Sequence, residues 1–315
     1  MGLSMELPRK HHYNPAFYLD RFVGPDGYVR EMRLVRGKVV LKSRHPDATG
    51  FQRDLYRIEG APEEHSQHLE VHFMSPLDNG AARALERIEA GDTMDWSADE
   101  RSEWVRFVIG FLFRHPASVA LIKKHFADMF QGAIEALERH YDEVRGPNDP
   151  ATFAEAYAQS NPAAAEIHAT NMIAELIDND RLGPTIFDMR WAVLEMKRSK
   201  FSVLTSDRPI YMPVPLGRPD AYILLPISPT KYFVAARQHP TIKALNQLDR
   251  TTLVREVNTA LVQQAREFVW GCDDSQRRFV EKHFAKLPER ELLTEAQMQE
   301  AINAARGATA KDFEE

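Results

Sequence analysis

Three residues of this chain combine reactive side chains with positions from which a fold can present them to a ligand: His12, Arg114 and Asp207. His12 lies just ahead of a predicted helix that begins at Pro15, and a helix N-terminus favours anions. Arg114 ends an apolar helix before Pro116, where a guanidinium can bind a carboxylate or a phosphate. Asp207 follows a predicted strand, in a Ser-Asp-x-Pro turn. An imidazole, a guanidinium and a carboxylate together would suit acid–base chemistry on an anionic substrate.

Each of these polar residues also has a structural interpretation. Asp207 can cap the turn that precedes proline. Arg114 can simply close its helix, because a buried Arg needs a partner. Asn258 lies among apolar helix positions, and we expect it to bond to backbone groups, since buried polar side chains must be satisfied.

A separate group of histidines has the spacing of metal ligands on a helix. The group has spacings of three and four residues, which bring all three rings near one helical face. No recognised ligand motif accompanies them, so we predict no metal site there. The three residues are His65, His68 and His72.

The predicted elements that would position these residues define an α+β protein. We interpret 1–315 as a single domain with a central antiparallel sheet over 186–236, wrapped by many helices. A hairpin over 28–42 would extend that sheet, a largely helical region covers 65–180, and C-terminal helices cover 249–305.

Several boundaries within this scheme are specific predictions. Ser97 and Glu100 form a capping box that starts a helix. Strands are predicted over 189–196 and 200–205, joined by a short turn, and a single helix is predicted from about 249 to Trp270.

Composition limits the class of protein. The formal net charge of -6 argues against a broadly basic coat for nucleic acid, although a local basic patch remains open. Cys272 is the only cysteine, so no intrachain disulfide can form. No signal-like core and no bilayer-length apolar run is present, and we therefore expect a cytoplasmic protein without a membrane partner. The usual phosphate-loop, dinucleotide, kinase and nucleophile-elbow motifs are absent.

The N-terminal segment His12-Tyr13-Asn14-Pro15-Ala16-Phe17-Tyr18-Leu19 resembles the His-Tyr-x-Pro-x-x-Tyr-Leu opening of the uncharacterised family catalogued as domain of unknown function 4238. Further similarities follow in the same order along about His12 to Trp270. They are Asp54-Leu55-Tyr56, Glu70 ahead of Glu89, Arg114-x-Pro116, Ser206-Asp207-Arg208-Pro209, Leu225-Pro226-Ile227-Ser228-Pro229, and Asn258 in a late helix. The resemblance implies a family but no established activity.

Two functional hypotheses remain open from the sequence. In the first, the protein is a nuclease-like hydrolase of phosphodiesters, with His12 as general acid or base, Asp207 as its orienter and Arg114 as the anion stabiliser. In the second, the same polar residues belong to a non-catalytic binding or sensing module for an anionic ligand or protein partner. The residues expected to contribute to binding in either case are Tyr18, Glu70, Ser206, Ser228 and Asn258.

The two hypotheses differ in a testable arrangement of side chains. If His12, Arg114 and Asp207 meet in one cleft, the hydrolase is favoured; an anion site without a nearby general base favours the binding module. The family motifs can also simply fasten the N-terminal segment to the sheet. Partners are expected to be an anionic small molecule or nucleic acid. The sequence leaves the cofactor unknown, with a divalent metal at Asp207 left open, and does not fix the oligomeric state.

Overall fold

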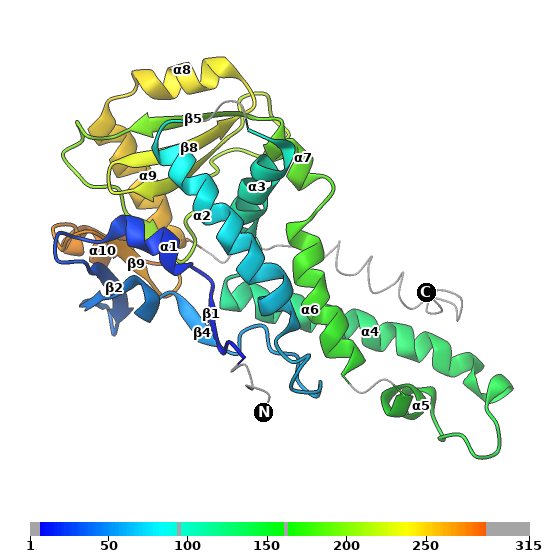
Figure 1. The fold of residues 1–315 in the computed structure, drawn as a ribbon. Helices are drawn as coiled ribbons and strands as arrows, with labels where there is room; N and C mark the ends of the chain where they lie inside the picture. Colours follow the sequence, from blue (N-terminus) through cyan, green and yellow to red (C-terminus); the bar gives the residue numbers. More distant parts are fainter. Residues whose placement is uncertain (1–6, 93–95, 161–162, 288–315) are drawn as a thin grey trace, which may run out of the picture.

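The computed structural model describes residues 7–92, 96–160 and 163–287 of the chain. Antiparallel sheets lie at one end of the molecule and long helices at the other (Figure 1). In chain order the helices and strands are β1 (Lys10–His12), α1 (Ala16–Leu19), β2 (Val29–Val35), β3 (Lys38–Arg44), β4 (Phe51–Arg53), α2 (Ser75–Glu89), α3 (Ala98–Phe113), α4 (Pro116–Val144), α5 (Phe153–Ser160), α6 (Ala164–Ile177), α7 (Leu182–Phe187), β5 (Arg190–Glu195), β6 (Thr205–Ser206), β7 (Tyr222–Ser228), β8 (Lys231–Ala236), α8 (His239–Gln247), α9 (Arg250–Gln264), β9 (Val269–Gly271) and α10 (Arg277–His283). This arrangement confirms the predicted α+β class and the largely helical middle region.

The three-stranded sheet β5–β8–β7 forms the centre of the fold, with helices on both faces (Figure 1). β8 is apolar along nearly its whole length because successive side chains of a strand point to opposite faces, and both faces of this strand are buried. Phe233 packs toward α3 against Trp104, with 5.4 Å between ring centroids. Tyr232 and Val234 join the cluster formed with α8 and α9. Burial on both sides therefore holds this sheet between two helical layers.

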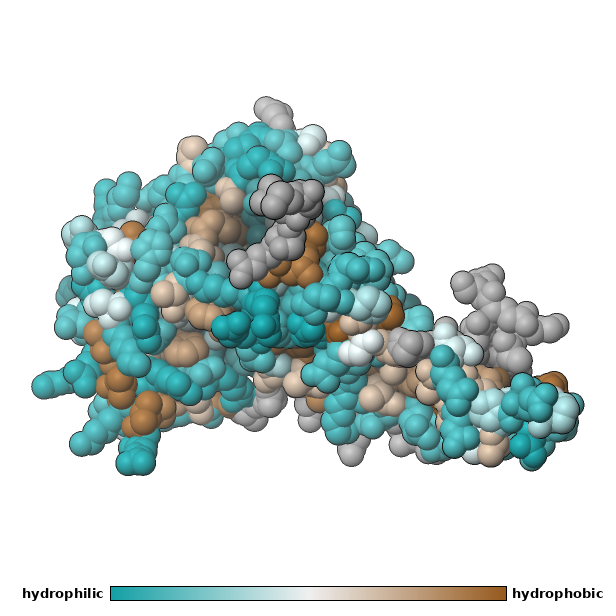
Figure 2. Space-filling view, turned by 60° about the horizontal axis from the view of Figure 1, so that its bottom comes forward, coloured by the Kyte–Doolittle hydropathy of each residue, from teal (hydrophilic) through white to brown (hydrophobic). Residues whose placement is uncertain are grey.

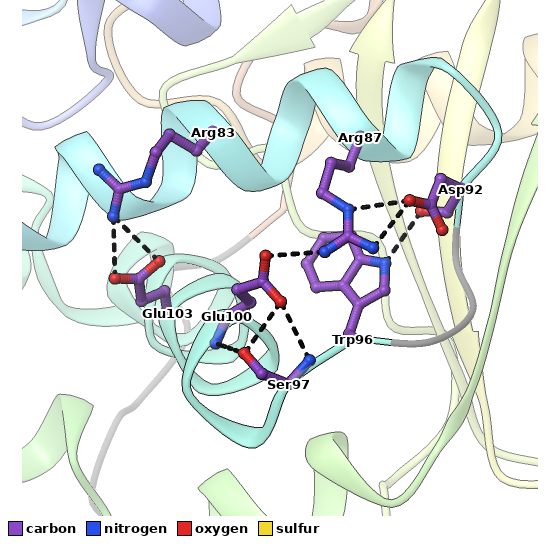
Figure 3. Close-up of polar contacts among 7 residues, drawn as sticks. All are labelled: Arg83, Arg87, Asp92, Trp96, Ser97, Glu100 and Glu103. Atoms are coloured by element: carbon purple, nitrogen blue, oxygen red, sulfur yellow. Dashed lines mark hydrogen bonds and ion pairs between the residues drawn. The ribbon is translucent and has the colours of Figure 1, made fainter.

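Helices α2 and α3 pack as an antiparallel pair, and the polar network of Figure 3 joins them. Arg83 of α2 donates to Glu103 at 3.1 Å, while Arg87, one turn further along, donates to Glu100 at 2.7 Å. The predicted capping box is present, since the Ser97 hydroxyl accepts from the Glu100 N–H and the Glu100 carboxylate accepts from the Ser97 N–H. This network fixes where α3 begins.

Helices α4, α5 and α6 extend away from the rest of the molecule as an arm (Figure 1). Pro116 at the first turn of α4 separates it from α3, and the two helices are bent by 79°. Among the described residues, no single helix is long and apolar enough to cross a bilayer; α3 and α4 meet that test of length and composition only as this bent pair.

The second sheet, β3–β2–β9–β6, corrects several predictions about strand pairing. The hairpin β2–β3 pairs with β9 rather than extending the central sheet. Of the strand predicted over 200–205, only β6 is present. The backbone just before β6 bonds to a side chain instead of a neighbouring strand, since the Leu204 N–H donates to the Asn258 side chain. The helix predicted to reach Trp270 ends at Gln264, and β9 follows it.

Two further helices were not predicted from the sequence, and one prediction cannot be examined. Helices α7 and α8 lie in segments that the sequence analysis left without an element. Both are short, and proline occurs within the first turns of α8. The helix predicted near residues 294–305 lies outside the described residues.

Candidate functional site

The two adjacent N-terminal histidines have different environments because they lie on opposite faces of β1. His11 is fully buried: its Nδ1 accepts from the Tyr56 N–H at 3.0 Å, and its Nε2 lies 3.1 Å from the Pro8 carbonyl oxygen. The ring stacks on Tyr56, with 5.3 Å between ring centroids. Burial lowers the pKa of His11, which is consistent with one neutral tautomer that uses both nitrogens. His11 therefore has a structural role.

His12 points away from these partners. Its side chain is 17% exposed, and Nε2 lies 4.0 Å from Asp47 Oδ1. That Nε2 has no hydrogen-bond partner among the described residues. Burial, followed by the nearby charge of Lys10, lowers the pKa of His12, so the ring is neutral near pH 7. Lys10 itself pairs with Asp47 at 2.8 Å.

Asp207 fastens the chain where α9 ends and β9 begins. Its carboxylate accepts from the backbone N–H groups of Arg266 (3.0 Å), Glu267 (2.5 Å) and Phe268 (3.0 Å). These three donors explain why the helix stops, since the freed N–H groups bind a side chain instead of continuing the helix. A divalent cation does not fit this carboxylate, because three N–H groups already occupy its oxygens.

His115, which sequence reasoning did not select, is the imidazole that Asp207 meets. His115 caps α4: its Nδ1 accepts from the Ala117 N–H at 3.1 Å, so the ring proton of the neutral form lies on Nε2. That Nε2 lies 3.6 Å from Asp207 Oδ2, and the Tyr13 ring packs edge-on at 5.5 Å between centroids. A polar residue directly before a helix-starting proline was the signal in the sequence.

Arg114 is the residue at which α3 ends, and it is buried, with an exposed fraction of 1%. Its Nη1 pairs with Asp78 Oδ1 at 2.9 Å, and the guanidinium carbon lies 5.4 Å from the Phe107 ring centroid. Gly110 leaves the necessary space, because a Cβ there would lie 2.7 Å from Nη2. Arg114 thus ties α2 to α3.

Glu70 forms a cluster with Asp78, Arg114 and Ser75, in which Glu70 and Arg114 are buried and the other two are half-buried. It begins a π-helical turn over Glu70–Met74 that leads directly into α2, and such turns are frequent at functional sites. The Ser75 hydroxyl donates to Glu70 Oε1 at 3.0 Å. Burial raises the pKa of Glu70 to about 7, opposed by the Ser75 hydrogen bond, while the Asp78 charge adds to the rise. Glu70 is therefore a titrating group near neutral pH.

The expected meeting of His12, Arg114 and Asp207 in one cleft has no direct contact between these side chains to support it. No hydrogen bond or ion pair among the described residues joins any two of these side chains; their partners are Asp47, Asp78 and backbone N–H groups, respectively. The reason lies in two local geometries. Alternation along β1 places His12 on the face opposite to His11, and the Arg114 side chain folds back along its own helix over Gly110.

Most of the other residues predicted to bind a ligand make hydrogen bonds within the fold. The Tyr18 hydroxyl hydrogen-bonds the Thr205 hydroxyl at 2.7 Å, and the Ser206 hydroxyl donates to the Arg208 carbonyl. Ser228 Oγ accepts from the Thr230 N–H in the β7–β8 turn.

Two asparagines bind backbone across long sequence distances. The Asn14 Nδ2 donates to the Ser206 carbonyl at 3.1 Å, and Pro15, not Asn14, holds the N-cap position of α1. Asn258 accepts from Leu204 N–H and donates to the Ser202 carbonyl, which confirms its expected bonding to backbone.

The three histidines ahead of α2, His65, His68 and His72, are all exposed. His68 and His72 lie with 4.5 Å between ring centroids. Within the described ranges, no group of three or more His, Cys, Asp or Glu side chains is arranged to hold a metal ion.

An exposed basic surface was missed by the sequence analysis, although its signal is present in the hairpin composition. Between residues 28 and 44 the only acidic residue is Glu31. The basic residues of the same segment are Arg30, Arg33, Arg36, Lys38, Lys42 and Arg44. This segment is therefore strongly cationic within a chain of net charge -6.

Strand register decides which of these side chains share a face. Residues opposite each other in an antiparallel pair point to the same side, and here the pairs are Arg33 with Val40, Val35 with Lys38, Glu31 with Lys42, and Val29 with Arg44. Trp270 pairs with Glu31 and points to the same side. Phe268 also lies on that side, because it is two residues before Trp270 in the extended chain. We call the exposed part of this side, formed by Arg33, Lys38, Lys42, Arg44 and Phe268, the basic face.

The basic face begins where a buried polar layer ends. Glu31 and Trp270 are covered by Thr49, which donates to Glu31 Oε2 at 2.6 Å and accepts from Trp270 Nε1 at 3.0 Å. The two arginines of the basic face are paired, Arg33 with Glu267 at 2.9 Å and Arg44 with Glu31 at 3.7 Å. Lys42, opposite Glu31, and Lys38, further along the hairpin, are exposed, and within the described part of the chain neither has a carboxylate at ion-pair distance. The end of the molecule that carries the hairpin shows apolar patches among hydrophilic side chains (Figure 2).

Comparisons with known proteins give a family but no described activity. No curated protein and no solved structure matches the chain. A family model matches residues 10–275, most of the chain's 315 residues. The chain therefore belongs to the family described as proteins of unknown function, DUF4238.

Proposed function

We propose that this protein is a non-catalytic binding module for an anionic partner, which docks on the basic face. The observation that carries the proposal is the concentration of cationic side chains on one side of β2 and β3, with Lys38 and Lys42 exposed and without ion-pair partners in the described chain. Free ammonium groups of this kind attract phosphates, sulfates or carboxylates and release counterions when they bind them.

The side chains expected to perform catalysis support this choice, because they are already engaged. Asp207 accepts from three backbone N–H groups, and Arg114 pairs with Asp78 in a buried position. His12 has neither of them as a neighbour within hydrogen-bond distance. The hydrolase hypothesis needs these three side chains close together, so the absence of contact between them favours binding over hydrolysis.

The test is retention on immobilised heparin, a sulfated polyanion. Lys38→Glu combined with Lys42→Glu should elute at a clearly lower salt concentration than the wild type, because two contacts are lost and repulsion is added. The matched control is Arg198→Glu combined with Lys243→Glu, which changes the net charge equally at exposed positions outside the basic face and should elute close to the wild type. Passage of the wild type without retention, or equal shifts for both double variants, would refute the proposal.

A second candidate function, hydrolysis of a phosphodiester, is favoured by the cluster around Glu70. A carboxyl group with a pKa of about 7 can donate or accept a proton at neutral pH, and Asp78 and Arg114 lie beside it. Solvent reaches this cluster at Asp78, whose side chain is about one-fifth exposed.

This candidate has its own assay with bis(p-nitrophenyl) phosphate. Turnover that depends on a group titrating near pH 7, and that falls by about 100-fold or more in Glu70→Gln, would establish it. Wild-type protein without turnover, or equal rates in the two proteins, would remove it.

A further inference from the structure

We infer that the anionic partner of the basic face is a single-stranded nucleic acid, whose phosphates pair with the lysines and whose bases stack on Arg33 and Phe268. The inference rests on the proposed function, since it names the polyanion that the basic face takes. It uses three observations: an aromatic ring within the basic row, a guanidinium lying over that ring, and exposed side chains along this face of β3.

The aromatic element is a pair of stacked rings on β9 and the residues before it. Phe268 is partly buried and lies on Trp270, with 5.5 Å between ring centroids and 29° between ring planes. The Arg33 guanidinium lies over the Phe268 ring at 5.6 Å from its centroid. The Arg33 side chain is 53% exposed and its Nη2 pairs with Glu267 Oε1 at 2.9 Å, so the outer face of the guanidinium lies toward solvent while this ion pair holds it over the ring.

Such a pair recognises bases rather than charge alone. Every base has a flat face that can stack on an aromatic ring or on a guanidinium, whereas sulfated sugars and lipid headgroups have none. In a duplex these base faces are already stacked on their neighbours, so only an unpaired strand can present them. The position of Arg33 and Phe268 among the lysines therefore favours a single strand over a duplex, a polysaccharide or a membrane.

The length of the face suits an extended strand. On this side Val29 and Glu31 of β2 are buried, so β3 provides the length of the face. Its seven residues correspond to roughly 20 Å at about 3.3 Å per residue. The Lys38 and Lys42 side chains lie four residues apart along β3 and share a face. The outer edge of β3 is partly closed by α10, because Glu281 accepts from the Val39 N–H and Arg277 donates to the Val39 carbonyl. Side chains of the face, rather than strand addition at the edge, are thus the available means of binding.

The test measures fluorescence anisotropy of labelled probes with the full chain. The probes are oligothymidine of about 20 nucleotides, an abasic strand of equal length, a duplex of equal length, and fluorescent heparin. Wild-type protein should bind oligothymidine about tenfold or more tightly than the abasic strand, which has the same phosphates but no bases. Its affinity should fall steeply as salt is raised.

Variants separate stacking from charge. Phe268→Leu should weaken oligothymidine binding about tenfold and leave heparin binding nearly unchanged, whereas Lys38→Glu with Lys42→Glu should weaken both. Phe201→Leu is the matched control, because Phe201 is an exposed phenylalanine outside the basic face. The abasic comparison uses only wild-type protein, so it decides the question even if Phe268→Leu fails to fold.

The outcomes distinguish this inference from the proposed function. If heparin binds through Lys38 and Lys42 but oligothymidine binds no better than the abasic strand or the duplex, the inference is refuted and the proposed function stands. Binding to phosphatidylserine vesicles without binding to oligothymidine refutes it in the same way. If none of the polyanions binds, both are refuted.

Discussion

Glu70 is a buried carboxyl group whose titration should be visible in the stability of the protein. Its pKa is raised to about 7 mainly by burial, so the folded state binds a proton more tightly than the unfolded chain. The stabilisation is complete below the pKa of the unfolded group and is lost as pH rises through about 7. We predict that the wild type loses about 2–3 kcal/mol relative to Glu70→Gln between pH 5 and pH 8.

Urea unfolding at both pH values measures this difference. Glu64→Gln, at an exposed carboxyl nearby in sequence, is the control and should follow the wild type at both pH values. A parallel pH dependence in wild type and Glu70→Gln would show that the buried cluster does not hold the proton.

The neighbouring residues His11 and His12 offer a matched pair at the residue scale. His11→Ala removes the acceptor of the buried Tyr56 N–H and a ring stacked on Tyr56, and should cost about 2–4 kcal/mol of unfolding free energy. His12→Ala should cost less than about 1 kcal/mol, because its Nε2 makes no hydrogen bond within the described chain. Thermal and urea unfolding of both variants checks the order; a larger loss in His12→Ala contradicts this assignment.

At the scale of elements, α1 and the strand β6 are held together by side chains rather than by backbone pairing. Asn14 binds the Ser206 carbonyl, and Tyr18 binds the Thr205 hydroxyl inside the core. The opening motif of the family thus fastens the N-terminal segment to the Ser-Asp segment. This is the structural alternative that the sequence had left open.

Tyr18→Ala should cost about 3–5 kcal/mol, because it empties a fully buried aromatic site next to Phe22 and Phe111. Tyr18→Phe keeps the ring and loses only the hydrogen bond, so about 1 kcal/mol is expected. Chemical unfolding gives both values. Tyr28→Ala, at an exposed tyrosine, is the control and should change stability by no more than about 0.5 kcal/mol. Equal effects at Tyr18 and Tyr28 would mean that α1 is not part of the core.

At the scale of the whole molecule, we predict that the arm of α4, α5 and α6 unfolds together with the rest. Ile173 and Ile177 of α6 belong to the same core cluster as Trp104 of α3, so the base of the arm shares the main core. All tryptophans lie outside 116–177, whereas far-UV circular dichroism reports the arm helices as well. The two signals should therefore give one coincident transition in urea. A dichroism change that precedes the fluorescence change would identify the arm as a separate unit.

Local sequence patterns determined those features that depend on neighbours along the chain. The Ser97 and Glu100 capping box, proline at the start of α4, and the apolar spacing of α2 and α3 are local, and the corresponding helices begin where predicted. Tyr18, Leu19 and Phe22 are buried because their spacing places them on one apolar side of the segment. The hairpin was predicted from its strand residues and its Arg36-Gly37 turn, where both residues have positive φ.

Only the tertiary structure decided how these elements meet and which polar side chains come together. Pairing of β2 with β9 joins segments more than 200 residues apart, and a strand pattern contains no information on its distant partner. The end of α9 at Gln264 depends on the Asp207 carboxylate, which arrives from another part of the chain. The same holds for the candidate site. The face of β1 on which His12 lies, and the folding back of Arg114 over Gly110, are set by packing. Residue type and position within an element therefore could not predict whether either side chain contacts Asp207.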